Sequence, residues 1–441
     1  MSAPRENTPS PVPATAQQGG EVHDRWPWVE PAAWTERMLT ALEAGANGGI
    51  WFRLIDKVWS LPNLASSAAK VAANKGVAGV DHVSVEQYGE HLDENLRRLH
   101  EQLRTGTYRP QAVRRAYIPK PGSTEQRPLG IPTVQDRVVQ GAVRHVLEPI
   151  FEKDFAAHSY GFRPRRGCKD GLRRVVQLLK TGHRYVVDVD LKSYFDTIPH
   201  DRLLARVRQK VADGRVLALV EAFLKAGIMD GLREWEPEAG APQGAVLSPL
   251  LSNIYLNPLD HHMAEQGFEM VRYADDFVVL CRSAEEAQRA LAVIGDWVAQ
   301  AGLVLHPTKT RIVDAETEGF DFLGYHFQYG KWWPRKKSLA KLKDTVRAKT
   351  KRANGRSLDC IIANLNPVLR GWFGFFQHST RTTFRRLDQW LRMRLRSILR
   401  KRRGGRGRGT GLSHQRWPNA FFAAHGLYNL VAAHAAACQS C

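Results

Sequence analysis

The sequence contains 441 residues, of which 43% are hydrophobic, so it is long enough for two to three domains with buried cores. It has no apolar run of about eighteen residues or more, which argues against a membrane-spanning helix. Residues 1–20 also lack the basic and then apolar pattern of a signal peptide. We therefore expect a cytoplasmic protein without a membrane partner.

The charge of the chain indicates a polyanionic partner. It has 64 Lys and Arg residues against 44 Asp and Glu residues, which gives a formal net charge of +20 at pH 7. Such an excess attracts nucleic acid by displacing its condensed counterions. A merely soluble basic protein and a protein that touches anionic lipid are the alternatives, but no amphipathic anchor or lipidation signal favours a membrane.

The five cysteines do not indicate a disulfide framework, because their number is odd and no secretion signal is present. Cys438 and Cys441 form a CxxC pair, yet a structural zinc site needs four ligands and no second pair lies at a suitable spacing. We expect the cysteines to be reduced and this pair to hold no metal.

The first part of the chain changes from irregular to periodic. Residues 1–45 mix Pro, Ser, Ala, Gln and Gly without sustained periodicity, which predicts a disordered tail. Residues 83–103 then repeat apolar side chains every three to four positions, which predicts an amphipathic helix.

The central part alternates strand and helix patterns. Residues 114–122 and 127–133 resemble two short strands around a loop, and residues 136–155 form a helical pattern with Pro149 near its kink or end. Residues 184–190 are rich in valine and end in an acidic pair, as expected of a central strand. Residues 269–281 predict a hairpin.

Two basic amphipathic helices are predicted beyond residue 330, over residues 338–352 and 382–403. An ordinary helix with a solvated charged face is the alternative. Because the second helix carries mostly arginine as its charge, including Arg385, Arg392 and Arg396, we favour contacts with RNA phosphates. Residues 404–411, rich in Gly and Arg, predict a flexible basic linker.

The acidic residues predict a metal site. Asp275 and Asp276 follow Tyr273 and Ala274 where the hairpin turns, while Asp188 and Asp190 end a separate strand. A surface turn is the alternative reading of the first pair. Carboxylates from two strands suit a pair of Mg²⁺ ions, with Mn²⁺ as an alternative, because these ions prefer oxygen ligands and substrate phosphate.

Ordered motifs between about residues 50 and 435 give the chain a specific resemblance to a bacterial group II intron reverse transcriptase, also called an intron-encoded maturase. The motifs are NKGVAGVD, YIPKPGSTEQRPLGIPTVQDRVVQ, SYGFRPRRGC, VDLKSYFDTIPH, GAPQGAVLSPLLSNIYL, RYADDFVVL, LHPTKTRI, FDFLGYHF, GWFGFF and RWPNAFFAAHGL. The chain is similar to the short class without a C-terminal endonuclease, whose members take a primer from another source, such as a nascent strand at a replication fork.

The resemblance implies that Asp190 and Asp275 hold both metal ions and that Asp276 completes the acidic catalytic site. Asp188 lies two residues from Asp190 on the same strand face, so we expect it to support the site rather than bind metal. Asp196 is expected to cap the following turn or helix.

The resemblance also implies a nucleotide pocket. Phe195 matches the bulky residue that excludes a ribose 2′-hydroxyl, although from the sequence alone a core phenylalanine is the better reading. Lys120 and Arg127 match the residues of the fingers that grip the triphosphate. Without the motif, each would be an ordinary surface charge.

Gln243 and Gly244 match the residues that form the floor of that pocket. Gln243 would contact the nucleotide, and Gly244 permits close backbone approach. A plain turn is the alternative. Lys309 matches a lysine near the triphosphate that would protonate the leaving pyrophosphate. Residues 322–325 resemble the hairpin that holds the primer end.

The implied fold is an α/β right-hand polymerase, with fingers and palm followed by an α-helical thumb, the maturase domain X. We expect a disordered tail over 1–45, fingers and palm over 46–330, and the thumb over 331–403. A basic linker and C-terminal nucleic-acid-binding segment is expected over 404–441.

The implied function is RNA-directed DNA polymerisation with help in intron splicing and mobility. The expected partners are group II intron RNA, template RNA, a DNA primer and deoxynucleoside triphosphates. One alternative is a domesticated relative in DNA repair or phage defence. The other is a catalytically silent RNA-binding splicing cofactor, against which the intact acidic residues argue.

Overall fold

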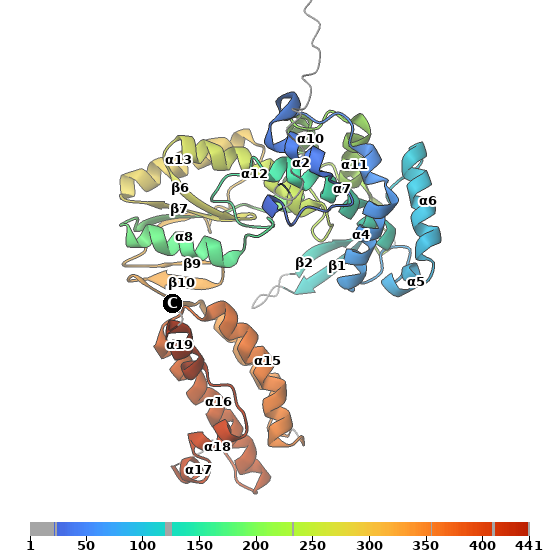
Figure 1. Cartoon of the computed structure of the whole chain (residues 1–441). Coiled ribbons are helices and arrows are strands. Elements are labelled where there is room, and N and C mark those ends of the chain that lie inside the picture. Colours follow the sequence, from blue (N-terminus) through green and yellow to red (C-terminus); the bar gives the residue numbers. More distant parts are fainter. Residues whose placement is uncertain are drawn as a thin grey trace, which may run out of the picture. The chain divides into compact units, whose positions relative to one another are not determined.

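The computed structural model describes residues 22, 24–119, 126–231, 233–353, 355–407 and 411–439. The chain divides into two compact units, Met1–Val175 with Val187–Arg311 and Val176–Val186 with Ile312–Cys441. Figure 1 labels their helices and strands. Within the described ranges, no helix is long and apolar enough to cross a bilayer.

The beginning of the first unit is folded. It contains α2 (Glu36–Glu43), η1 (Ala46–Gly49), α3 (Ile55–Val58) and α4 (Leu61–Ala73). The predicted disorder over residues 1–45 is therefore wrong from residue 24 onwards, because apolar side chains such as Trp34 and Leu39 are buried there. Residues 1–21 and 23 lie outside the described residues.

Trp34 also compensates a proline in α7 (Val134–Glu152). Pro149 lies inside this helix near its end, as expected, and has no N–H to donate to the carbonyl of His145 four residues earlier. The indole Nε1 of Trp34 donates to that carbonyl at 3.0 Å. A buried acceptor that the helix leaves unpaired is thus satisfied from the N-terminal segment.

The predicted helix over residues 83–103 is two helices, α5 (Val85–Glu90) and α6 (Leu92–Thr105). Ser84 and Gln87 form a capping box at the start of α5. The break follows Gly89, a weak helix former, and His91 adopts a non-helical backbone between the two helices. Leu96, Leu99 and Leu103 on α6 are buried, as the periodicity predicts.

A four-stranded sheet follows with the strand order β2-β1-β4-β5. Its strands are β1 (Val113–Pro119), β2 (Gln126–Ile131), β4 (Ile228–Asp230) and β5 (Arg233–Trp235). The predicted strand pair is confirmed, because β1 and β2 are antiparallel neighbours.

A second sheet has the order β6-β7-β3-β8. It consists of β3 (Tyr185–Asp190), β6 (Glu269–Tyr273), β7 (Asp276–Cys281) and β8 (Arg311–Asp314). The valines of β3 are buried, and β6 and β7 form the predicted antiparallel hairpin. The helices around the sheets are α8 (Cys168–Lys180), α9 (Tyr194–Thr197), α10 (His200–Arg208), α11 (Gly214–Lys225), α12 (Ser248–Glu265) and α13 (Ala284–Gln300).

The second unit contains a small sheet and a helical core. The strands β9 (Phe320–Phe322), β10 (Tyr325–Gln328) and β11 (Lys331–Pro334) form an antiparallel sheet with β10 in the centre. The helices are α14 (Lys336–Lys349), α15 (Leu358–Phe376), α16 (Arg381–Arg402), α17 (Gly411–Arg416), α18 (Asn419–Ala424) and α19 (Leu430–Gln439). Both predicted basic helices are present as α14 and α16.

The described part of the predicted C-terminal segment, 404–441, is not separate from this helical core. Trp417, Phe422 and Leu430 are buried in the same apolar cluster as residues of α14, α15 and α16. The prediction was wrong here because it followed the Gly and Arg run and missed the apolar residues after it. Residues 408–410, 440 and 441 lie outside the described residues, and with them Cys441 of the CxxC pair.

Candidate active site

The β6–β7 hairpin places Asp275 at its tip. Tyr273 pairs with Asp276, so Ala274 and Asp275 form a two-residue turn. Ala274 has a left-handed backbone with φ 61°, which is uncommon for a residue with a Cβ atom. The surrounding structure must therefore hold this turn in shape.

A buried arginine holds it. The side chain of Arg272 is fully buried, and its Nε donates to Oδ1 of Asp260 at 2.7 Å. Its Nη1 donates to the carbonyl of Ala274 at 3.0 Å and to Oδ1 of Asn253 at 2.9 Å. Arg272 thus links α12 to the turn of Ala274 and Asp275.

The sequence reasoning missed Arg272 and Asn253. The available signal was an arginine inside an otherwise apolar strand, because a buried guanidinium requires a carboxylate partner elsewhere in the fold.

A glycine brings a second segment against the same turn. A Cβ atom on Gly161 would lie 2.2 Å from the backbone nitrogen of Ala274, so no other residue fits there without movement of the backbone. Asn253 donates from Nδ2 to the carbonyl of Gly161 at 2.8 Å, and the N–H of Tyr160 donates to the carbonyl of Arg272 at 2.9 Å.

Asp190 lies at the end of β3, where the segment around Lys309 meets it. The N–H of His306 donates to the carbonyl of Asp190 at 2.8 Å, and the N–H of Lys192 donates to the carbonyl of Val304 at 2.8 Å. These bonds bring Nζ of Lys309 to 3.1 Å from Oδ2 of Asp190. Lys309 therefore forms an ion pair with an acid of the candidate site.

Asp190 and Asp275 interact electrostatically. Burial raises the pKa of Asp275 above its ordinary value and the carboxylate of Asp190 raises it further, while the guanidinium groups of Arg127 and Arg272 lower it. Side chains from three segments, β3, β2 and the β6–β7 hairpin, therefore interact at Asp275. Arg127 lies on β2, and its charge acts on Asp275.

The fit of these residues to divalent metal rests on two carboxylates. Among the described residues, no group of three or more His, Cys, Asp or Glu side chains lies close enough to hold a metal ion. Asp276 is exposed at the start of β7, directly after the turn residue Asp275. Asp190 and Asp275 offer the oxygen ligands that Mg²⁺ prefers, and the Lys309 ammonium occupies a cation position beside Asp190.

Asp188 takes a supporting position, as expected. Its Oδ2 lies 3.7 Å from Nε of Arg311 in an ion pair. Asp196 lies within the short helix α9 rather than at its N-cap, which is Ser193. The helix that follows, α10, has Pro199 as its N-cap, so the expectation that Asp196 caps the following helix is wrong.

The loop of Gln243 and Gly244 packs on β2. The N–H of Gly130 donates to the carbonyl of Gln243 at 2.7 Å. Gly244 has φ 105°, and a Cβ atom there would lie 2.7 Å from the carbonyl oxygen of Gly130. Only glycine permits this approach. Oε1 of the buried Gln140 accepts from the N–H of Val246 at 2.8 Å and fixes the loop.

Phe195 is half-buried and borders a cavity of about 590 Å³. Its carbonyl accepts from the N–H of Ala241 at 2.7 Å, which ties α9 to the chain that leads into the Gln243 loop. Because its ring lines a cavity, Phe195 is not a purely internal core residue. Lys120 lies outside the described residues.

One predicted RNA-binding arginine is internal. Arg396 is 3% exposed, and its guanidinium donates to the carbonyl of Trp417 at 2.8 Å and to Oδ1 of Asn419 at 2.9 Å. The prediction of a phosphate contact is therefore wrong for Arg396. Its neighbours on the same face of α16 pack into the helical core. Arg385 is exposed and Arg392 is half-exposed, so both are accessible.

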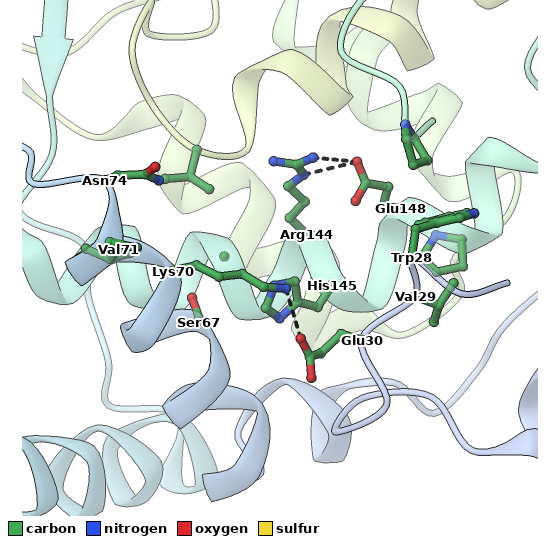
Figure 2. A pocket seen from close by; sticks show the side chains of 15 residues that line it. Trp28, Val29, Glu30, Ser67, Lys70, Val71, Asn74, Arg144, His145 and Glu148 are labelled. Atoms are coloured by element: carbon green, nitrogen blue, oxygen red, sulfur yellow. Dashed lines mark hydrogen bonds and ion pairs between the residues drawn. The ribbon is translucent and has the colours of Figure 1, made fainter. Parts of the chain in front are cut away.

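A second cavity, of about 440 Å³, lies among the N-terminal segment, α4 and α7. Figure 2 shows Lys70 between Glu30 and His145. Lys70 Nζ lies 2.9 Å from Oε2 of Glu30 and 2.8 Å from Nε2 of His145, and Arg144 pairs with Glu148 at 2.7 Å. The charged side chains that line this cavity are paired with one another, and they link the N-terminal segment, α4 and α7.

Two protein families match the chain. Reverse transcriptase (RNA-dependent DNA polymerase) matches residues 118–327, and the group II intron, maturase-specific domain matches residues 339–417. The predicted α/β polymerase fold followed by a helical part is confirmed. The second match extends beyond residue 403, in agreement with the shared helical core.

Several known proteins are similar to the chain. Protein YkfC of Escherichia coli (strain K12) is 36% identical over 304 residues, which cover 59% of this chain and 79% of YkfC. Group II intron-encoded protein LtrA of Lactococcus lactis subsp. cremoris is 43% identical over 168 residues, which cover 38% of this chain and 28% of LtrA. A chain in a structure of telomerase from Candida albicans is 12% identical with a TM-score of 0.41, over 71% of this chain and 64% of that one.

The two family matches follow one another along the chain in the order of the motifs, and YkfC is matched over most of its length. The chain therefore belongs to the group II intron reverse transcriptase and maturase family, and it carries that family's RNA-dependent DNA polymerase and maturase-specific domains.

Proposed function

We propose that this chain copies RNA into DNA by nucleotidyl transfer at Asp190 and Asp275. The observation that carries the proposal is the meeting of these two carboxylates with Arg127 and Lys309, which come from separate segments. Two neighbouring carboxylates attract cations, and the two cationic side chains suit the triphosphate of an incoming nucleotide.

Asp190 and Asp275 would hold a pair of Mg²⁺ or Mn²⁺ ions, with Asp276 as a further acidic group near the site. When bound, two such ions activate the primer 3′-hydroxyl and stabilise the charge of the leaving pyrophosphate. The remaining oxygen ligands would come from the substrate phosphates and from water.

The other residues of the site position the nucleotide. Arg127, together with Lys120, would grip the triphosphate, and Gln243 and Gly244 would form the floor beneath the nucleotide. Phe195 would exclude a ribose 2′-hydroxyl. Lys309 would leave its ion pair with Asp190 and give its proton to the leaving pyrophosphate.

We further propose that the helical unit binds group II intron RNA and assists splicing and mobility of the intron. The maturase-specific family match over residues 339–417 supports this, and so do the exposed arginines of α16, such as Arg385. LtrA is a group II intron-encoded protein, and its similarity agrees with the proposal.

Two other functions remain as alternatives. A domesticated relative that serves DNA repair or phage defence would keep the same catalytic residues, and flanking DNA that folds as an intron would distinguish it. A catalytically silent splicing cofactor has less support, because Asp190, Asp275 and Arg127 are all present and close together.

Replacement of Asp275 tests the polymerase proposal. Asp275→Ala removes an oxygen ligand from the metal site and should abolish extension of a DNA primer on an RNA template at any Mg²⁺ concentration. RNA affinity should persist, because the substitution removes negative charge and leaves the basic helices intact. Primer extension and equilibrium RNA binding are measured on the same protein.

Asp296→Ala is the matched control, because Asp296 is an exposed acid on α13. It should extend primers like the wild type. Extension by Asp275→Ala near the wild-type level would refute the catalytic assignment. A wild-type protein that binds RNA but extends no primer would favour the splicing-cofactor function.

A further inference from the structure

The loop between α7 and α8, which packs against the turn of Ala274 and Asp275, has an unusual backbone conformation. Within residues 161–166, two residues other than glycine have left-handed backbones, Phe162 with φ 58° and Arg165 with φ 58°. A phenylalanine rarely adopts this conformation, because its Cβ atom clashes with the backbone. Strain of this kind persists only where neighbouring contacts enforce it, and it concentrates at functional sites.

Buried contacts on either side of Phe162 enforce the conformation. Arg163 is 7% exposed, and its Nε donates to Oε1 of Glu152 at 2.9 Å. Its Nη1 donates to the carbonyls of Ala156 at 2.6 Å and Ser159 at 2.8 Å. Gly161 is wedged against Ala274 on the other side. The loop is therefore a rigid extension of the catalytic turn.

Phe162, between these anchors, and Arg165, which follows them, are both exposed. Phe162 is 43% exposed, and its ring centroid lies 6.4 Å from that of Tyr273, two residues before Asp275. Arg165 is exposed and forms no hydrogen bond or ion pair with another residue in the described ranges. Phe162 thus presents an aromatic ring beside the hairpin that carries Asp275, and Arg165 presents an exposed cation three residues further along the same loop.

We propose that Phe162 and Arg165 bind the primer strand at its growing end. Phe162 packs on the base or sugar of the terminal nucleotide, and Arg165 neutralises a phosphate of the same strand. The inference rests on the proposed polymerase function. It adds a contact that positions the 3′-hydroxyl for attack.

The chemistry of the two residues fits this ligand. The primer 3′-hydroxyl must reach Asp190 and Asp275, so the nucleotide that lies beside Tyr273 belongs to the end of the primer. A phenyl ring has no hydrogen-bonding group, and it therefore contacts every base alike, which a polymerase that copies any sequence requires. An arginine that follows the backbone adds affinity without reading sequence.

A purely structural role predicts different behaviour. A phenylalanine that stabilises the fold would be buried, and its replacement would lower the melting temperature. At Phe162, replacement by glycine removes the left-handed strain, so the fold should keep its melting temperature or gain. Loss of function without loss of stability therefore separates the two roles.

The first experiment uses the full chain with an RNA oligonucleotide annealed to a DNA primer. Phe162→Gly should raise KM for the primer–template about tenfold, the range of one aromatic–base contact, while its melting temperature is no lower than that of the wild type. Phe162→Tyr should restore KM, because it keeps the ring. Phe52→Ala, at another exposed phenylalanine, is the matched control and should leave KM unchanged.

The second experiment tests Arg165 by the salt dependence of binding to the same primer–template. Arg165→Gln should lower the slope of log affinity against log salt by about 0.7 to 0.9. Arg104→Gln is the control, because Arg104 is paired with Glu101 at 2.6 Å, and it should keep the wild-type slope.

The outcomes separate this inference from the function on which it rests. Wild-type protein that extends no primer would overturn the proposed function. Wild-type extension with an unchanged KM in Phe162→Gly would overturn the primer contact alone. A lower melting temperature in Phe162→Gly would also overturn it, since it would assign Phe162 to the fold.

Discussion

At the scale of single residues, the most consequential side chain outside the acidic pair is Arg272. It is fully buried and shares two hydrogen bonds with Asp260 while it holds the carbonyl of Ala274. Removing one partner of a buried ion pair leaves an uncompensated charge, whereas replacing both partners by apolar groups is often neutral. The effect of Arg272 on the stability of the fold and its effect on the position of the Ala274 turn can therefore be measured separately.

Arg272→Met should lower the free energy of unfolding by about 3 to 5 kcal/mol, because Asp260 is left buried without a partner. The double variant Arg272→Met with Asp260→Leu should recover much of that stability. It should still extend primers slowly, because the donor to Ala274 and Asn253 is gone and the turn loses its shape. Denaturant unfolding and single-turnover extension measure the two effects.

Recovery of both stability and turnover in the double variant would show that Arg272 serves the fold alone. A conservative Arg272→Lys variant completes the comparison, because its single ammonium cannot reach all three acceptors of the guanidinium.

Phe195 allows a test of sugar selection. Phe195→Ala should admit ribonucleotides while it preserves much of deoxynucleotide incorporation, because the ring borders the cavity beside α9 and its removal makes room for a 2′-hydroxyl. Single-nucleotide incorporation of both sugars on an RNA template gives the discrimination ratio. A folded variant with the wild-type ratio would contradict the assignment of Phe195 as the steric gate.

At the scale of elements, α7 joins the N-terminal segment to the rest of the first unit. Lys70 is a donor only, so Nε2 of His145 must accept from it, and the proton of the neutral ring lies on Nδ1. That Nδ1–H donates to Oδ1 of Asn63 at 2.8 Å. Burial lowers the pKa of His145 to about 4, and the Lys70 charge adds to the effect.

Stability should therefore fall in mild acid. Between pH 6.5 and about 4 the unfolded chain binds a proton at His145 that the folded chain does not, so the free energy of unfolding decreases as the pH falls through this window. The full effect is on the order of 3 kcal/mol. Melting temperatures from pH 7.5 to 4.5 would show it.

His145→Gln should keep both hydrogen bonds and lose this pH dependence, because an amide donates and accepts without titrating. His414→Gln, at an exposed histidine, should retain the wild-type pH dependence. Equal slopes for wild type and His145→Gln would place the acid sensitivity elsewhere.

At the scale of the whole molecule, the net charge of +20 favours nucleic acid, but only accessible cations contribute to binding. The arginines of α16 differ in this respect. Arg385 is exposed and Arg392 is half-exposed, whereas Arg396 is bonded to Trp417 and Asn419 in the interior of the helical unit.

Arg385→Gln and Arg392→Gln should each lower the salt slope of RNA binding by about 0.7 to 0.9, with little change in melting temperature. Arg396→Gln should lower the melting temperature and leave the salt slope unchanged, because it removes two internal hydrogen bonds and no phosphate contact. Filter binding of structured RNA across a salt series, together with thermal unfolding, measures both. A reduced slope for Arg396→Gln at an unchanged melting temperature would contradict this division.

The sequence by itself determined the order of elements and most of the local chemistry. Valine-rich β3, the β6–β7 hairpin, α14 and α16 follow from periodicities of two and 3.6 residues, which depend on side-chain direction within one segment. The motifs also singled out Asp190, Asp275 and Gly244 as candidate site residues. Local patterns failed where burial overrode composition, as at Trp34 and Trp417, whose apolar contacts order segments that their neighbours would leave irregular.

Only the tertiary structure decided which charges are internal and which are exposed. Arg272 and Arg396 are arginines like any other in the sequence, and they differ from Arg385 because distant segments supply their acceptors. The same holds for the acidic site, where Lys309 reaches Asp190 through backbone bonds to a segment more than a hundred residues away. Pairing of charges over such separations depends on packing, because the cost of burying a charge is offset only by a partner that the fold brings into contact.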